Sequence, residues 1–503
     1  MSQLKKGAML SYVSILLTNL LGIVLTPFMI RTLGDSDYGL YTLIGSVIGY
    51  ISVMDFGLNN TVVRFVAKYR AEDDRKGEEN FLAVTMIIYS VISALVVLVG
   101  IAMYFNLDNV FERSLTVAEM QKARIMFAIL IFNLALTLPG GAFAAICSGY
   151  EHFVWPRALN IIKYVVRSAL VVALLLMGGD AIGVVILDTV MTLLVIALNG
   201  YYVLRRIKVR FRLHQFEMTM VKRIFSYSVW IFVFAMVGQF QWRAGQVILG
   251  SVSGTTAVAI YGVGIMLGTY YGAFSTAVSG VFRPRATKMT VQNASGEELT
   301  SMMIRIGRIS FLVLLMILGG YFLFGKQFVM LWVNKTYLEA WSISMIIMVA
   351  YTLPLVQAFA NSILEARSKF AFKAVVYILL IVLGTGVGTY LIRDYGIVGL
   401  TIGSTGGWLL SQVIMNIYYQ RAIGLNIPRF LLELCRGLLP SFVVVVALGL
   451  LIDRLPGDGW LNLAAKIAIY AAVYILVMLK FGVNKTEADM FRSSVPKFSK
   501  RNV

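Results

Sequence analysis

Five charged side chains lie inside long apolar stretches of this 503-residue sequence: Asp55, Lys163, Arg167, Asp188 and Arg243. A charge at that depth in a membrane is unfavourable unless it faces a cavity or a partner. Arginine keeps its charge and binds phosphate in a forked geometry, so the cations suit an anionic ligand. The carboxylates suit a coupled proton or sodium ion, or pairing with a cation; for Asp188, an arginine such as Arg243 is one candidate partner.

Arg243 is the clearest candidate for contact with a substrate. Gln239 and Gln246 lie on the same face of the predicted helix, and an arginine directed at lipid would be strongly unfavourable. We therefore predict that these three side chains face inward and line the substrate site.

A second cationic stripe is formed by Arg157, Asn160, Lys163 and Arg167, which recur at helical spacing. At 1.5 Å per residue, Arg167 would lie about 13 Å deep in the membrane. Lys163 is close enough to the interface for its ammonium group to extend into the headgroup region. We predict that Asn160, Lys163 and Arg167 line a cavity.

Three further charges allow two interpretations each. Asp55 lies in Ser52-x-x-Asp55-x-x-x-Asn59 on one face of a predicted helix, where it either makes a structural hydrogen bond or couples to a cation. Arg31 and Arg64 stand at the ends of predicted spans, where they either mark the interface or form the rim of a cationic path.

Uncharged polar residues at membrane depth either bind sugar hydroxyls or join helices, and the second interpretation is favoured. They are Asn19, Gln357, Asn361, Gln412 and Asn416. Three glycines within one apolar segment, Gly384, Gly386 and Gly388, predict close packing of helices.

The elements that carry these residues are predicted to be membrane helices. Hydrophobic residues make up 59% of the chain, so lipid must be the solvent, and no long alternating segments suggest a barrel. About fourteen spans of roughly 20 residues are expected. They lie near 8–30, 40–62, 81–105, 123–147, 158–178, 182–203, 224–250, 257–282, 305–325, 341–364, 374–392, 397–420, 438–453 and 461–481.

Lys and Arg concentrate in alternate loops, which predicts that both termini are cytoplasmic. The net charge of +19 is then explained by topology and contact with anionic headgroups, so nucleic acid is not expected as a partner. Both cysteines and both histidines fall at cytoplasmic positions. We therefore expect no disulfide, no histidine proton relay within the membrane, no metal site and no cofactor.

Residues 1–210 and 216–425 repeat one hydrophobic pattern at an offset of roughly 216 positions. The repeat predicts two six-helix lobes around a central cavity, at 1–215 and 216–428. Residues 429–481 form an additional helix pair with three interpretations: a lipid-facing flank, a place for a lipid tail or, as favoured, padding or stabilisation. Residues 482–503 form a cytoplasmic tail that is either a surface segment or disordered. The deep charges have no charged mates at this offset, so they are where the substrate is expected.

Enzyme classes are not favoured. The chain has no predicted soluble domain, no phosphate-binding glycine loop and no His/Ser/Asp cluster, and its outer loops are short. We therefore expect a protein that is not an enzyme.

Several local sequences are similar to those of a known transporter group. They are Arg31–Tyr41 after the first span, Met54–Leu58 with Arg64–Lys68, Cys147–Phe153 and Ile260–Gly262. The chain resembles the polysaccharide and oligosaccharide-lipid flippases, including the O-antigen flippases, of the multidrug/oligosaccharidyl-lipid/polysaccharide exporter superfamily. The resemblance implies two lobes, alternating access and an undecaprenyl-diphosphate-linked oligosaccharide for O-antigen, lipopolysaccharide or capsule assembly.

The function expected is that of a flippase in the bacterial cytoplasmic (inner) membrane. Its partners would be the lipid-linked oligosaccharide, membrane lipids, a proton or sodium ion, and the polymerase and glycosyltransferases of the same pathway. The alternative is a cation-coupled multidrug or small-molecule exporter of the same superfamily. That activity favours carboxylates in the cavity, whereas the buried charges here are mainly cationic.

Overall fold

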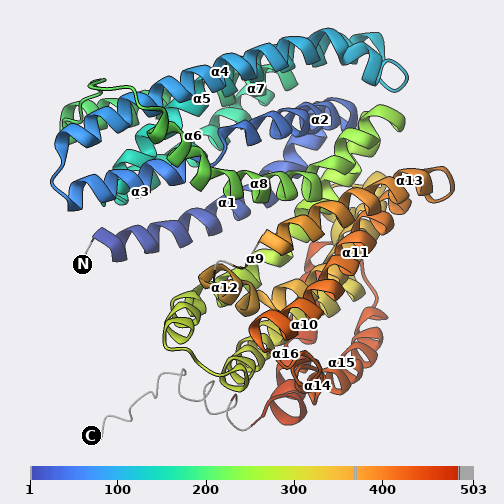
Figure 1. Ribbon diagram of the computed structural model, residues 1–503. Helices are drawn as coiled ribbons and strands as arrows, with labels where there is room; N and C mark the ends of the chain where they lie inside the picture. Colours follow the sequence, from blue (N-terminus) through green and yellow to red (C-terminus); the bar gives the residue numbers. More distant parts are fainter. Residues whose placement is uncertain (1–2, 368, 370, 485–486, 488–503) are drawn as a thin grey trace, which may run out of the picture. The chain divides into compact units, whose positions relative to one another are not determined.

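The computed structural model describes residues 3–367, 369, 371–484 and 487, and every regular element within them is a helix (Figure 1). Twelve helical segments of this part of the chain are long and apolar enough to span a membrane. One of them, α13 (Ala371–Ile423), contains two of the fourteen predicted spans. Another predicted span, near 224–250, forms the helix α8 (Met218–Val252), which is not among the twelve. The prediction of an all-α multi-pass membrane protein is confirmed.

The chain forms two compact units, Met1–Gly262 and Val263–Val503. In the first, Figure 1 shows α4, α5 and α7 side by side, and each neighbouring pair is in contact. Its elements are α1 (Gln3–Leu33), α2 (Asp35–Ser52), η1 (Val53–Asp55), α3 (Leu58–Ala71), α4 (Arg75–Phe111), α5 (Val117–Gly149), α6 (Val154–Leu176), α7 (Ala181–Tyr201), η2 (Tyr202–Ile207), α8, and the start of α9 (Thr255–Val291).

Hydrogen bonds explain why α8 packs within the first unit although it begins the second sequence repeat. The Gln246 side chain accepts a hydrogen bond from Ser46 of α2, and the Gly250 carbonyl accepts one from Ser114. At the start of α9, the Thr255 hydroxyl donates to Glu119 of α5 over 2.8 Å. The compact unit therefore extends beyond the predicted repeat boundary at 215/216.

The second predicted span is broken, so the continuous helix expected over 40–62 is wrong. After η1, Phe56 (φ 51°) and Gly57 (φ 68°) adopt left-handed backbone conformations before α3 begins. Glycine tolerates this conformation, whereas phenylalanine is strained in it by about 1–3 kcal/mol. The Phe56 ring stacks on Phe232 of α8 at 4.6 Å between centroids and meets Phe225 edge-on, which holds the strained residue in place.

The second unit is also helical. Figure 1 shows α10, α15 and α16 together, and all three pairs are in contact. Its elements after α9 are α10 (Gly296–Trp332), η3 (Lys335–Tyr337), α11 (Leu338–Val356), α12 (Ala358–Ala366), α13, α14 (Ile427–Cys435), α15 (Leu438–Asp453), α16 (Trp460–Val477) and η4 (Met478–Gly482).

The helix α13 reverses direction at Gly396, whose φ of 56° suits glycine. The two arms pack closely: a Cβ on Gly384 would lie 2.6 Å from the Gly403 carbonyl oxygen, and one on Gly388 would lie 2.7 Å from that of Leu400. Close packing is confirmed for these two glycines. It is wrong for Gly386, which has nothing within 4 Å of its Cβ position.

Arg308 of α10 joins the added helices to this unit. Its guanidinium, only 5% exposed, forms a forked ion pair with Glu487 and donates to the carbonyls of Glu433, Arg436 and Gly482. Glu487 is equally buried, so its predicted place in a surface tail is wrong. One arginine of α10 thus holds the segments on both sides of the final helix pair, and the stabilising role of the pair itself stays a prediction.

Replacing Arg308 with Ala should destabilise the second unit by about 3–5 kcal/mol, because it leaves a buried carboxylate without its partner. The unfolding temperature of the detergent-purified protein measures this. Arg429→Ala is the matched control, since it removes an exposed ion pair to Glu297 worth about 0–1 kcal/mol. Equal effects of the two substitutions would contradict the anchoring role of Arg308.

Candidate functional site

The deepest ion pair of the first unit joins α6 to α7. Arg167 Nε lies 2.5 Å from one oxygen of Asp188, and Nη2 lies 3.0 Å from the other, in a forked geometry. The Tyr41 hydroxyl of α2 donates to Asp188 over 3.0 Å and accepts from Arg167 over 3.2 Å. The partner of Asp188 is therefore Arg167, and pairing with Arg243, one of the possibilities raised, is wrong.

The other members of the α6 stripe divide between lipid-side and interior positions. Lys163 donates to the Thr192 hydroxyl of α7 over 2.9 Å and is partly buried. Asn160 is exposed, so the structure does not place it with Lys163 and Arg167. The stripe thus contributes one neutralised arginine and one lysine bonded only to a neutral oxygen.

Arg243 reaches α2 from α8. Its Nη1 donates to the Gly45 carbonyl over 3.2 Å, and its side chain passes so close to Gly49 that a Cβ there would lie 2.5 Å from Cδ. Gln246 is buried and bonded to Ser46, which makes it a link between helices. The buried Oε1 of Gln239 has no hydrogen-bond partner in the described part of the chain. Gln239 therefore has unused capacity to accept a hydrogen bond.

The two arginines converge on one stripe of α2. Tyr41, which binds Arg167, and Gly45, which binds Arg243, are four positions apart and therefore lie one above the other on the helix. Tyr41 did not emerge from the sequence as a site residue, because a tyrosine in an apolar helix is common and its contacts depend on neighbouring helices. The absence of a side chain at Gly49 makes room for Arg243.

Asp55 lies at the break between α2 and α3, not inside a continuous helix. Its oxygens are 3.4 and 3.5 Å from the Asn59 amide nitrogen, and the Tyr89 hydroxyl donates to Asn59 over 3.1 Å. The carboxylate has no salt bridge within the described residues. A role in cation coupling therefore stays a prediction, on an interrupted helix of the kind that lines ion sites in transporters.

Arg31 is exposed in the last turn of α1, whereas Arg64 is exposed in the middle of α3 and not at a helix end as predicted. The structure does not bring them together with Arg167 and Arg243, so their role as the rim of a cationic path also stays a prediction.

In the second unit, uncharged polar residues form one hydrogen-bonded network between helices. Gln412 donates to Gln357 and accepts from the Tyr377 hydroxyl, and Asn361 accepts from Tyr419 and from Lys373 over 2.7 and 2.8 Å. Gln357 and Gln412 are completely buried. These contacts confirm the interpretation that Gln357, Asn361 and Gln412 join helices.

Comparison with known proteins identifies the family. The sequence profile of the family described as "Polysaccharide biosynthesis protein" matches residues 4–290, more than half of the chain. The chain belongs to that family. The recognition drawn from the motifs near Arg31–Tyr41 and Met54–Leu58 is thereby confirmed.

Two relatives of the chain agree with the family assignment. A putative O-antigen transporter of Shigella flexneri is 19% identical over 402 residues, covering 78% of this chain and 92% of the relative. An uncharacterized membrane protein, EpsK, of Bacillus subtilis (strain 168) is 30% identical over 129 residues, 25% of each chain.

Solved structures show that the chain shares its fold with transporters. The lipid II flippase MurJ in an inward closed conformation matches with a TM-score of 0.74 at 12% identity, over 97% of this chain and 99% of that structure. An inward-facing MATE family transporter of the MOP superfamily matches with a TM-score of 0.67 at 14% identity, over 84% and 98%. The predicted superfamily fold is confirmed.

If Arg167 and Asp188 form one neutral unit, Arg167→Leu and Asp188→Leu should each destabilise the protein by about 3–5 kcal/mol. The double variant should return close to the wild-type unfolding temperature, because an apolar pair can replace a buried ion pair. Additive losses in the double variant would show that the two side chains do not depend on each other.

Gly49→Ala should displace the Arg243 side chain, whereas Gly45→Ala meets nothing within 4 Å. Both changes add one methyl group to the same helix face, so they form a matched pair. We expect surface polysaccharide to fall at least about tenfold in cells carrying Gly49→Ala, with membrane levels of the protein unchanged, and to stay normal with Gly45→Ala. Normal polysaccharide in both would argue against a need for Arg243 in this position.

Proposed function

We propose that this protein is a flippase that moves an undecaprenyl-diphosphate-linked oligosaccharide from the cytoplasmic to the outer leaflet. One observation carries the proposal: the membrane helices of the first unit hold more cationic than anionic charge at the site. Arg167 and Asp188 neutralise each other, whereas Lys163 and Arg243 donate only to a hydroxyl and a carbonyl oxygen. Neither cation has an ion pair among the described residues.

This charge excess suits a diphosphate. A doubly charged headgroup cannot cross about 30 Å of hydrocarbon without losing its hydration. Fixed cations offset that loss, and arginine does so with two parallel hydrogen bonds to phosphate. Gln239, with its unpartnered amide oxygen, offers an acceptor for a sugar hydroxyl near Arg243.

An apolar groove in the second unit suits the lipid part of such a substrate. It has a volume of about 320 Å³ and lies between α10 and α16, where Gly320, Phe324, Phe328 and Ile467 contribute to its walls. A polyprenyl chain could remain in such a groove or in lipid while the headgroup crosses. This gives the added helix pair a second role besides stabilisation.

Transport would follow alternating access of the two repeats around a central cavity, as in other duplicated transporters. Asp55 and Asp188 are the candidates for coupling to a proton or sodium ion. The protein would act in the bacterial inner membrane with both termini in the cytoplasm, beside the glycosyltransferases and polymerase that make and extend the oligosaccharide.

The second candidate function is export of small organic cations, which the similarity of fold to a multidrug resistance transporter supports. The charges favour the flippase, because Lys163 and Arg243 would repel a cationic drug. Counterflow of an organic cation through purified protein in vesicles, without movement of a lipid-linked sugar, would decide for the exporter.

The direct test is a reconstituted flipping assay with a polyprenyl-diphosphate-linked oligosaccharide in proteoliposomes. Arg243→Ala should reduce the flipping rate at least about tenfold, because losing one charge-assisted hydrogen bond costs about 1.5 kcal/mol. Arg243→Lys should restore part of the rate. Arg113→Ala, at an exposed position, is the matched control. A wild-type flipping rate in Arg243→Ala would show that Arg243 does not bind the substrate. Absence of flipping by the wild-type protein would refute the proposed function.

A further inference from the structure

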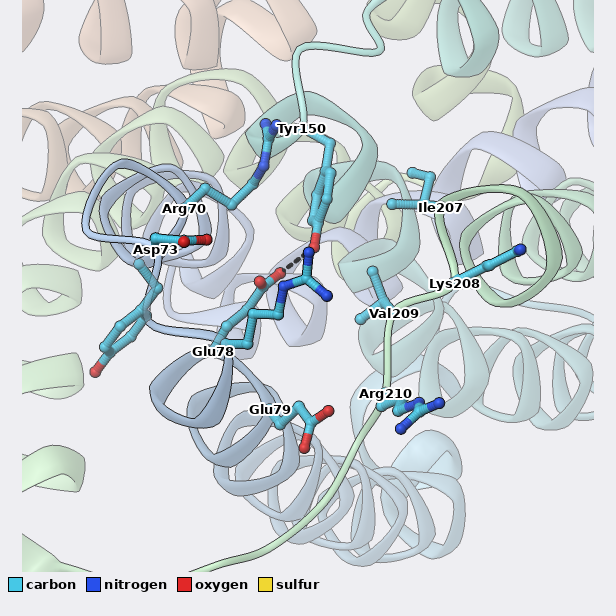
Figure 2. Close-up of a pocket in the computed structure, with 11 residues that line it drawn as sticks. Arg70, Asp73, Glu78, Glu79, Tyr150, Ile207, Lys208, Val209 and Arg210 are labelled. Atoms are coloured by element: carbon cyan, nitrogen blue, oxygen red, sulfur yellow. Dashed lines mark hydrogen bonds between the residues drawn. The ribbon is translucent and has the colours of Figure 1, made fainter.

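A cavity of about 640 Å³ in the first unit lies apart from the membrane charges described above (Figure 2). It is formed by the end of α3, the start of α4, Tyr150 and the segment 207–210 that follows α7. The distribution of Lys and Arg predicts that this end of the helices is cytoplasmic. The cavity would therefore lie at the level of the inner-leaflet headgroups.

The segment that forms one wall is held in a defined position. Val209 is buried and its backbone nitrogen donates to the Val203 carbonyl over 3.3 Å. Further along, the buried Asn80 side chain accepts hydrogen bonds from the backbone nitrogens of His214 and Gln215 over 2.8 and 2.9 Å. Lys208 and Arg210 are the two neighbours of the buried Val209, so this anchor holds their backbone at the cavity wall.

The acidic side chains that line the cavity have more hydrogen-bond partners than the basic ones. Figure 2 shows Lys208 and Arg210 on one wall and Glu78 and Glu79 on the other. Glu78 accepts a hydrogen bond from the Tyr150 hydroxyl over 2.7 Å, and Glu79 lies 3.1 Å from a ring nitrogen of His214.

Lys208 and Arg210, in contrast, form no ion pair within the described part of the chain, whereas Arg75 attracts the carboxylate of Glu78; all three cations are exposed. Of the three lining carboxylates, Asp73 alone forms no side-chain hydrogen bond or ion pair within the described residues. Cationic groups are therefore the larger unsatisfied set, and the cavity favours an anion.

Apolar side chains next to this wall point to a lipid as the source of the anion. Leu204, Leu213 and Phe216 are each more than half exposed on the same connecting segment that carries the cations. Exposed apolar side chains interleaved with cations are typical of a segment that lies in the membrane interface. Basic pockets between the cytoplasmic ends of membrane helices recognise anionic lipid headgroups.

We infer that this cavity binds the phosphodiester headgroup of an anionic inner-leaflet phospholipid through Lys208, Arg210 and Arg75. The bound lipid links α4 to the segment that connects the two sequence repeats. This site is independent of the substrate and of the flippase function proposed above.

Native mass spectrometry of the purified full-length protein with added phosphatidylglycerol tests the inference. The variant Lys208→Asn/Arg210→Gln removes two cavity cations, and asparagine tolerates the left-handed backbone at position 208 (φ 63°). The matched control Arg206→Gln/Arg212→Gln removes two exposed cations of the same segment that do not line the cavity. We expect lipid binding to weaken at least tenfold in the first variant and less than twofold in the control.

Two further measurements separate the possible ligands. Phosphatidylcholine should bind at least tenfold more weakly than phosphatidylglycerol, and glycerol phosphate at the same concentration should not displace the lipid. Equal losses in both variants, or equal binding of the two lipids, would overturn the site. Displacement of the lipid by glycerol phosphate would overturn the inference that the bound anion is a lipid headgroup and would assign the cavity to a soluble phosphate compound.

Discussion

The arrangement of the first unit depends on one constraint: a charge within a membrane helix must be neutralised, hydrated or bound. Asp188 and Arg167 meet this constraint together, and Tyr41 completes their hydrogen bonds. Arg243 meets it by reaching a backbone carbonyl of α2 across two glycine positions. Because both arginines end on α2, this helix brings charges from α6 and α8 to adjacent levels. The remaining cationic excess is the physical basis for expecting an anionic substrate.

The same constraint has a different solution in the second unit. There the membrane-depth polar groups are mostly neutral and satisfy one another, as Gln357, Gln412 and Tyr377 do. The strongest charge pair, between Arg308 and Glu487, serves to attach the added helices and the start of the tail. The two sequence repeats therefore share a helical scaffold while their polar interiors differ.

The helix break at Asp55 shows how strain and packing combine. Phe56 adopts a conformation that its side chain disfavours, and aromatic contacts with α8 hold it there. Such interruptions expose backbone groups at membrane depth, which is where transporters bind ions and substrates. In this protein the break is supported by a helix of the second sequence repeat. Movement of α8 would therefore change the surroundings of Asp55 as well as the position of Arg243.

The sequence by itself determined the class of protein, nearly all of the spans, the repeat and the identity of the deep charges. These follow from hydrophobicity and helical spacing, which are local properties of the chain. Only the tertiary structure decided that Asp188 pairs with Arg167, that Gln246 joins helices, that Asn160 is exposed and that Glu487 is buried. Each of these outcomes depends on which helices are neighbours and at what level they meet, whether the two residues are 21 positions apart, as Arg167 and Asp188 are, or 200, as Ser46 and Gln246 are. A local pattern can show that a charge needs a partner, but the packing of helices selects the partner.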